Sequence, residues 1–143
     1  MVLVDSNIWI RANQPKGDLL AKVALESLLE EDEAAFCGPV KLEVLGAMRP
    51  LSRPRFDAFF SLVPYLEMNA ATWDQSVSIG RALYDQAKVT LPWNDVLIAA
   101  IAQRNDCRVY TMDAHFDVIA RIAGIRLYEP GVGGTFNPDH PTL

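Results

Sequence analysis

A short apolar segment at the start of the chain narrows the possible folds considerably. Residues 2–4 are continuously apolar and rich in β-branched side chains, and they end in the polar run Asp5-Ser6-Asn7. Continuous rather than alternating apolarity is typical of a strand buried on both faces, as in a parallel sheet. The opening of the chain therefore favours an α/β fold with helices on the faces of the sheet.

The remaining segments alternate in a way that supports this fold class. Further strands are predicted over residues 34–37, 65–68, 108–111 and 125–128. Helices are predicted over residues 6–10, 17–31, 38–48, 56–63, 70–87, 94–105 and 114–123, and residues 49–55 are expected to form a loop or helix junction. Strands separated by helices predict a layered α/β structure whose sheet has about five parallel strands joined by right-handed crossovers.

Two of these helices carry apolar stripes. The helix over residues 56–63 places three phenylalanines on one face, most simply the core face, with a dimer seam or a groove for a partner helix as alternatives. The helix over residues 70–87 places Trp73, Val77 and Tyr84 at helical spacing. It has the clearest amphipathic pattern in the chain.

Length and composition fit a single domain. The chain has 143 residues, of which 50% are hydrophobic, which is enough for one core. We expect one domain over residues 1–129 and a Gly/Pro-rich, mobile tail over residues 130–143. The longest apolar run, residues 96–102, is far shorter than the ~20 residues of a membrane helix, and the N-terminus lacks the basic segment of a secretory signal. We therefore expect a soluble, cytoplasmic protein that does not bind membranes.

Several common kinds of site are missing from the sequence. It contains no Gly-rich phosphate motif of the form GxGxxG or GxxxxGK[ST] and no GxSxG nucleophile motif. Cys37 and Cys107 lack CxxC spacing and are predicted to be buried free thiols. The two histidines, His115 and His140, form no zinc motif, and His115 is interpreted as a surface or helix-start residue.

Four carboxylates lie where an α/β sheet places its ligands, in the crevice beyond the carboxyl ends of the strands. Asp5 and Asp113 follow predicted strands, Glu43 lies early in the helix after the second strand, and Asp95 opens the helix over residues 94–105. Each has apolar sequence neighbours, so partial burial is expected. Taken singly, each also has a structural explanation: helix capping for the aspartates and a helical surface position for Glu43.

Taken together, these four residues, the acid quartet, point to a cation. Carboxylates drawn to one sheet edge repel each other by about 4 kcal/mol per pair at 4 Å and an effective dielectric of 20. Mg²⁺ or Mn²⁺, which prefer oxygen ligands, would remove this conflict. A net charge of −5 otherwise speaks against nucleic-acid binding, but the acid quartet accounts for four of those five charges.

The motifs around the acid quartet match a known family. They are Val2–Asn7, Glu43, Asn94–Ala100 and Thr111–Phe116. In this order and spacing they resemble the PIN-domain family, and more narrowly the VapC-type ribonuclease toxins of bacterial and archaeal toxin–antitoxin pairs. The resemblance extends over residues 1–128 and implies a three-layer sandwich with a parallel central sheet.

The resemblance also implies an activity and partners. The chain would be the toxin of a type II pair, a Mg²⁺- or Mn²⁺-dependent endoribonuclease in which metal-activated water attacks a phosphodiester. By this resemblance the acid quartet would be catalytic and hold the metal, with Glu43 binding directly or through water, and Ser6, Asn7 and Thr111 would be supporting polar residues. RNA would be the substrate, and a VapB-like antitoxin and a second copy of the chain the protein partners.

RNA would need positive charge and stacking surfaces at the site. The candidates for RNA contact are Arg11, Lys16, Arg49, Arg53, Arg55 and Trp93. The plainer interpretations are a solvated surface for the cations and core or interface packing for Trp93.

Three alternatives remain open from the sequence. A PIN-like module could bind RNA or a partner without cutting it. A phospho-receiver domain should have adjacent acids after the first strand and a lysine after a late strand, where this chain has Ser6-Asn7 and Arg126. A haloacid-dehalogenase-type phosphatase needs Asp-x-Asp after the first strand, and position 7 is Asn.

Overall fold

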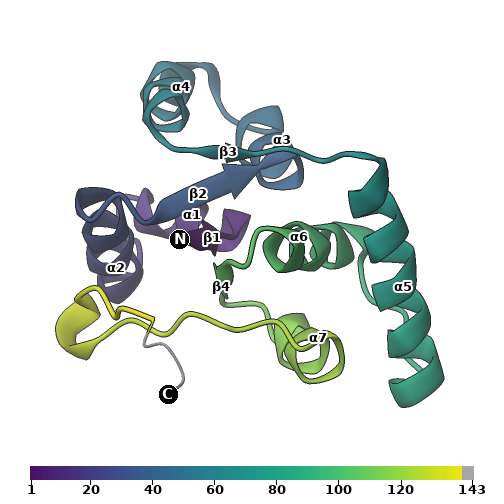
Figure 1. Cartoon of the computed structure of the whole chain (residues 1–143). Coiled ribbons are helices and arrows are strands. Elements are labelled where there is room, and N and C mark those ends of the chain that lie inside the picture. Colours follow the sequence, from purple (N-terminus) through teal and green to yellow (C-terminus); the bar gives the residue numbers. More distant parts are fainter. Residues whose placement is uncertain (140–143) are drawn as a thin grey trace.

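A four-stranded parallel sheet lies at the centre of the computed structural model, which describes residues 1–139 (Figure 1). Its strands are β1 (Val2–Val4), β2 (Ala34–Cys37), β3 (Tyr65–Leu66) and β4 (Arg108–Tyr110). They are ordered β3-β2-β1-β4, with β1 paired to both β2 and β4. Residues 2–4 are fully buried, as their continuous apolarity predicts.

The predicted fifth strand does not form. Residues 125–128 contribute one isolated bridge, between Leu127 and Val109 of β4, and two hydrogen bonds to Val109. Pro130 follows closely and has no amide N–H to continue a ladder. β3 is also shorter than predicted: it spans Tyr65–Leu66, whereas the sequence predicts a strand over residues 65–68.

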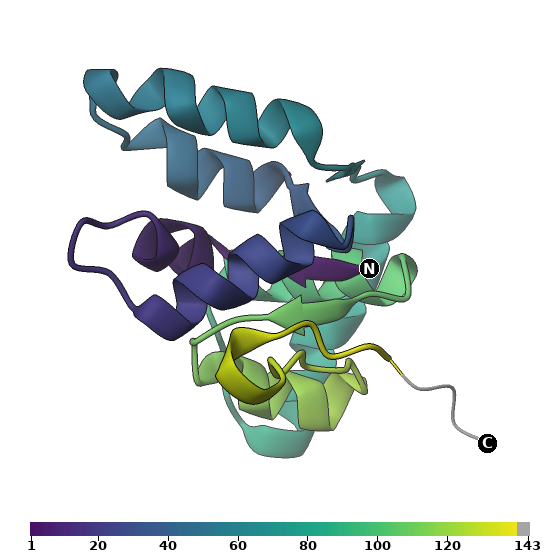
Figure 2. The ribbon, with the colours of Figure 1, turned by 90° about the vertical axis from the view of Figure 1, so that its left-hand side faces the viewer.

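Helices cover both faces of the sheet. Their bounds are α1 (Ser6–Ala12), α2 (Leu19–Glu30), α3 (Gly38–Gly46), α4 (Arg53–Leu62), α5 (Ala70–Ala87), α6 (Trp93–Arg104) and α7 (His115–Ala123), with 3₁₀ turns η1 (Pro50–Ser52) and η2 (Val132–Gly134). α1 and α2 pack together on one face, and α6 and α7 lie on the other with α5 outside them (Figure 1). α3 and α4 form a separate layer beside the β3 edge (Figure 2).

Residues 49–55 form a helix junction, which is one of the two structures predicted for this segment. Residues 50–52 form η1, and Arg53 to Arg55 are the first turn of α4. Pro54 is compatible with this position because the first amides of a helix have no intrahelical acceptor.

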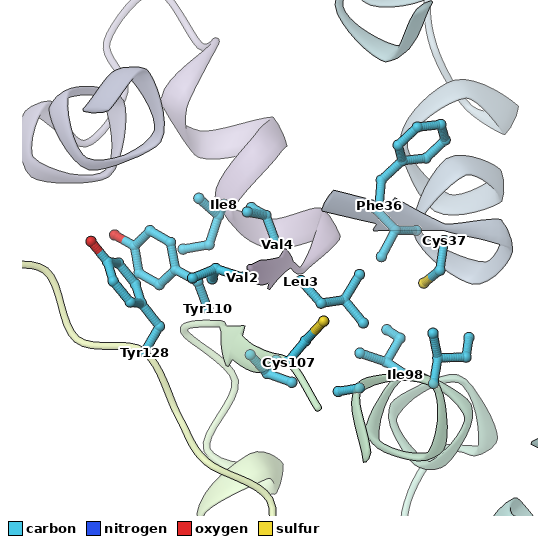
Figure 3. Packing of buried hydrophobic residues seen from close by; sticks show 14 of the residues in the cluster. Val2, Leu3, Val4, Ile8, Phe36, Cys37, Ile98, Cys107, Tyr110 and Tyr128 are labelled. Carbon is cyan, nitrogen blue, oxygen red and sulfur yellow. The ribbon is translucent and has the colours of Figure 1, made fainter. Parts of the chain in front are cut away.

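The core is continuous across the sheet (Figure 3). Phe56 and Phe60 are buried, which confirms the core interpretation of their helix face, and the Phe60 ring centre lies 5.0 Å from that of Trp9. Cys37 and Cys107 are buried free thiols, as predicted, and burial raises the pKa of the Cys37 thiol to about 12.

The apolar stripe of α5 faces solvent instead of the core. Trp73, Val77 and Tyr84 are each more than half exposed, whereas the buried face of α5 carries Thr72, Ser76, Ile79 and Leu83. An amphipathic helix ordinarily turns its apolar stripe inward, so this stripe is available to another molecule.

Residues 130–139 pack against the domain and do not form the free tail that composition predicts. η2 lies against α2, and the Phe136 ring stacks on Tyr128 with ring centres 6.5 Å apart. Arg108, only 7% exposed, donates from Nη1 to the Asn137 carbonyl at 2.9 Å. Residues 140–143, the rest of the predicted tail, lie outside the described residues. Within residues 1–139, no helix has the length and apolarity to cross a membrane.

Candidate metal centre

The topology brings the acid quartet to one end of the sheet. Asp5 follows β1 and Asp113 lies beyond β4, and these two strands are parallel neighbours. Glu43 projects from α3, which follows β2, and Asp95 lies in the first turn of α6. The carboxyl ends of parallel neighbouring strands open onto the same crevice, so this grouping follows from the sheet order.

Asp5 is the most connected member of the quartet. It caps α1 by accepting the Ser6 amide on Oδ1 at 2.7 Å. Its Oδ2 accepts the Thr111 hydroxyl at 2.7 Å and the Asn7 amide group at 3.1 Å. The residue is 3% exposed, so it needs these donors to replace water.

Glu43 is held from two elements although it is exposed. The Ser6 hydroxyl donates to Oε2 at 2.9 Å, and the Asn94 amide group donates to Oε1 at 3.1 Å. The expected partial burial of this acid is therefore wrong. The long side chain of Glu43 reaches from the middle of α3 to the sheet edge and still contacts water. Both carboxylate oxygens therefore stay accessible to solvent.

Asp95, Asp113 and His115 form the third part of the centre. His115 Nδ1 lies 2.9 Å from Asp95 Oδ2 and 3.2 Å from Asp113 Oδ1, and one potential ligand atom from each residue lies within 4.8 Å of the other two. The His115 amide donates to Asp113 Oδ1 at 2.9 Å, which orients the turn before α7. Asp95 is buried and Asp113 is intermediate, as expected for both.

Ser6, Asn7 and Thr111 connect the carboxylates. Thr111 Oγ1 donates to Asp5 and accepts the Asp113 amide at 3.0 Å, while Asn7 Oδ1 accepts the Met112 amide at 3.1 Å. The side chain of Ser6 contacts Asp5 and Glu43. These contacts join the segments after β1 and β4 into one polar network.

The electrostatics of the centre fit a divalent cation. Burial raises the pKa of Asp5 above its ordinary value, against the hydrogen bonds from Thr111 and Ser6, and the charges of Glu43 and Asp95 raise it further. Burial also raises the pKa of Asp95; the hydrogen bond with His115 lowers it, and the Asp113 and Glu43 charges raise it. Carboxylates that disfavour each other's ionisation gain most from a cation among them. Their oxygens are also the ligands that Mg²⁺ and Mn²⁺ take.

Two residues of the centre were not assigned from the sequence. Asn94 was part of the motif around Asp95 but received no role, and it contacts Glu43. His115 begins α7, as the sequence predicts, but its ring also contacts two of the acids. The sequence signals that could have indicated these roles were the position of Asn94 directly before Asp95 and that of His115 two residues after Asp113.

The cationic RNA-contact candidates lie on α1, on α4 and in the segments that follow α1 and α3. Lys16 and Arg49 line a groove of about 700 Å³ between the ends of α1 and α3. Arg53 donates to the Met48 carbonyl at 3.1 Å, and the Arg55 guanidinium lies over the Phe59 ring. Arg11 is exposed on α1.

Trp93, the aromatic candidate, lies against α5. It is 64% exposed and packs close to Gly80, where an added Cβ would be 3.4 Å from the indole ring. It precedes Asn94 in the sequence, but the hollows that it lines are formed mostly with residues of α5 and α6.

Comparison with known proteins assigns the chain to a family. A model of the PIN domain matches residues 2–122. The chain belongs to the PIN-domain family. Ribonuclease VapC11 of Mycobacterium tuberculosis is similar to it, with 32% identity over 130 residues that cover 88% of this chain and 96% of that protein.

Solved structures agree with this PIN-domain fold. FitAcB from Neisseria gonorrhoeae has a TM-score of 0.73 at 17% identity, covering 90% of this chain and 97% of the other. VapBC2 from Rickettsia felis, bound to a DNA fragment from its promoter, has a TM-score of 0.71 at 21% identity, covering 90% and 98%. At these identities the likeness concerns the fold, an α/β sandwich around a parallel sheet.

Proposed function

We propose that this PIN domain is the toxin of a type II toxin–antitoxin pair and cleaves RNA with a bound divalent cation. The polar network that joins the acid quartet across β1, α3, α6 and β4 is the main support. The similarity to VapC11, named a ribonuclease, supports RNA as the substrate. Four carboxylates gathered at one sheet edge repel each other, and a bound cation would offset that cost.

In this proposal, the residues of the acid quartet have different roles. Asp5, Asp95 and Asp113 hold the cation, and Glu43 binds it directly or through water. A bound Mg²⁺ or Mn²⁺ supplies positive charge that favours hydroxide formation and stabilises the phosphodiester transition state.

Ser6 and Asn94 orient Glu43, so that its carboxylate can position the attacking water and accept its proton. Attack at phosphorus breaks the bond to the 3′-oxygen, which takes a proton from solvent. The products then carry 5′-phosphate and 3′-hydroxyl ends.

Purified protein incubated with structured RNAs in Mg²⁺ or Mn²⁺ tests the proposal. We expect cleavage that EDTA abolishes and that Asp5→Asn or Asp113→Asn lowers by about 100-fold or more, because each removes a charge that acts in the transition state. Asp57→Asn, an exposed acid on α4, is the matched control and should retain activity. Cleavage that survives chelation or the Asp5 substitution contradicts the proposal, and no cleavage of any RNA favours the non-catalytic binding module.

The protein partners belong to the same proposal. A solved structure that shares the fold, at a TM-score of 0.61, is a toxin–antitoxin complex from Klebsiella pneumoniae, which supports a VapB-like antitoxin for this chain. We place RNA cleavage in the cytoplasm. The groove between the ends of α1 and α3 has a mostly apolar lining that suits a partner helix, and Lys16 and Arg49 add positive charge to it.

A further inference from the structure

His115 contacts the acids from inside the proposed metal centre. Its Nδ1 faces Asp95 Oδ2 and Asp113 Oδ1 at 2.9 and 3.2 Å, so a single position lies between one nitrogen and two carboxylate oxygens. These three residues are a group whose ligand atoms lie close enough together to hold one ion. The ring atom that contacts both acids therefore lies where it could bind a cation that the acids share.

The backbone supports this orientation of the ring. The backbone amide of His115 donates to Asp113 Oδ1. This hydrogen bond fixes the position of His115 relative to Asp113, which the imidazole ring also contacts. Asp95 approaches from the first turn of α6, which is a different element. The His115 side chain is 45% exposed, which leaves Nε2 access to water when Nδ1 faces the centre. A metal-bound imidazole commonly donates its other N–H to a carboxylate, a carbonyl or water.

We propose that His115 Nδ1 is a direct ligand of the divalent cation, together with Asp95 and Asp113, and that the centre therefore prefers a first-row transition ion such as Mn²⁺ over Mg²⁺. The inference rests on the proposed function, because it takes the acid quartet as the cation site. Mg²⁺ takes oxygen ligands and keeps several waters. Transition ions accept imidazole nitrogen more readily, so a mixed nitrogen and oxygen donor set favours them.

Electron spin-echo envelope modulation of Mn²⁺ bound to the full chain tests the nitrogen ligand directly. We expect ¹⁴N modulation from imidazole in the wild-type protein and its loss in His115→Gln, whose side-chain oxygen can still bind a cation. His140 is the other histidine of the sequence, and His140→Gln should keep the signal. A second measurement, the ratio of Mn²⁺ to Mg²⁺ affinity by calorimetry, should fall by about 10-fold in His115→Gln.

The outcomes separate this inference from the proposed function. Mn²⁺ that binds in an Asp5-dependent way without ¹⁴N modulation, or with modulation that persists in His115→Gln, contradicts the His115 ligand and leaves the acid quartet as the cation site. An unchanged affinity ratio in His115→Gln contradicts the metal preference. Absence of Asp5-dependent Mn²⁺ binding contradicts both proposals.

Discussion

Asp5 contacts side chains from two distant parts of the chain. Ser6 and Asn7 are its immediate neighbours, whereas Thr111 reaches it from the segment after β4. One residue therefore caps α1, joins two strand ends and supplies a carboxylate to the proposed cation site. When no cation is bound, ionisation of the Asp5 carboxyl is disfavoured, because burial and the neighbouring acids raise its pKa. The ionised carboxylate that a cation needs is therefore costly in the metal-free protein.

The raised pKa of Asp5 predicts that the stability of the metal-free protein depends on pH. An acid whose folded pKa is raised stabilises the fold fully below its ordinary pKa, near 4, and that contribution is lost as pH rises through the raised value. Asp5→Asn keeps a good helix cap but cannot ionise. In EDTA, we expect the free energy of unfolding of the variant to rise relative to the wild type between pH 4 and pH 7.

Urea denaturation of both proteins at the two pH values measures this difference. Saturating Mn²⁺ at pH 7 should reverse the order, because only the wild type retains the full cation site. A difference between the two proteins that is the same at pH 4 and pH 7 would show that Asp5 carries no electrostatic cost in the fold.

The sequence identified the acids of this site but not all of their neighbours. Asp5 and Asp113 could be placed because they follow apolar strands, and parallel strands end at the same edge. Asn94 and His115 act through contacts between α3 and α6 and between α6 and the start of α7. Such contacts depend on how helices pack, which local spacing does not encode.

At the level of the secondary-structure elements, α5 differs most from its expected packing. Periodicity correctly predicts a helix over residues 70–87, but it does not say which surface the apolar stripe contacts. The buried face of α5 instead carries Thr72 and Ser76, whose hydroxyls bond within the helix end and so tolerate burial. The outward stripe of Trp73, Val77 and Tyr84 is unusual for a surface that faces only water.

We expect this stripe to form the interface of a homodimer. Val77, at the middle of the stripe, lines a hollow of about 170 Å³ with Trp73 and Trp93. Val77→Asp should weaken self-association by about 100-fold, because a charge would be buried without a partner. Light scattering after size-exclusion chromatography measures the mass, and Leu51→Asp, at a 97% exposed apolar position on η1, is the control. A wild-type monomer, or a Val77→Asp dimer of unchanged affinity, would contradict this interface.

For the whole molecule, the C-terminal segment raises the question of where the domain ends. The change in composition predicts a boundary at residue 129, and this boundary stays a prediction. The segment that follows nevertheless covers Arg108, whose guanidinium lies 4.9 Å from the Tyr128 ring centre and donates to Asn137. Glycine and proline content indicates where a chain can bend. It does not predict a contact such as the hydrogen bond from the buried Arg108 guanidinium to the Asn137 carbonyl.

Deleting residues 130–143 is expected to lower the free energy of unfolding by about 3 kcal/mol, because the hydrogen bond from Arg108 to Asn137, the stacking of Phe136 on Tyr128 and the packing of η2 on α2 would be lost. Thermal and urea denaturation measure the loss. Removing only residues 140–143 controls for the end of the chain and should have little effect. Equal stability of the two truncated proteins would support a domain that ends at residue 129.

One cation shared by acids from four separate segments defines the proposed metal centre. Anomalous diffraction from crystals grown with Mn²⁺ locates such an ion without reference to activity. We expect a peak about 2.1 Å from carboxylate oxygens of Asp5, Asp95 and Asp113, with Glu43 and His115 beside it. A peak elsewhere on the surface, or none at saturating Mn²⁺ with the four carboxylates unliganded, would contradict the proposed metal centre.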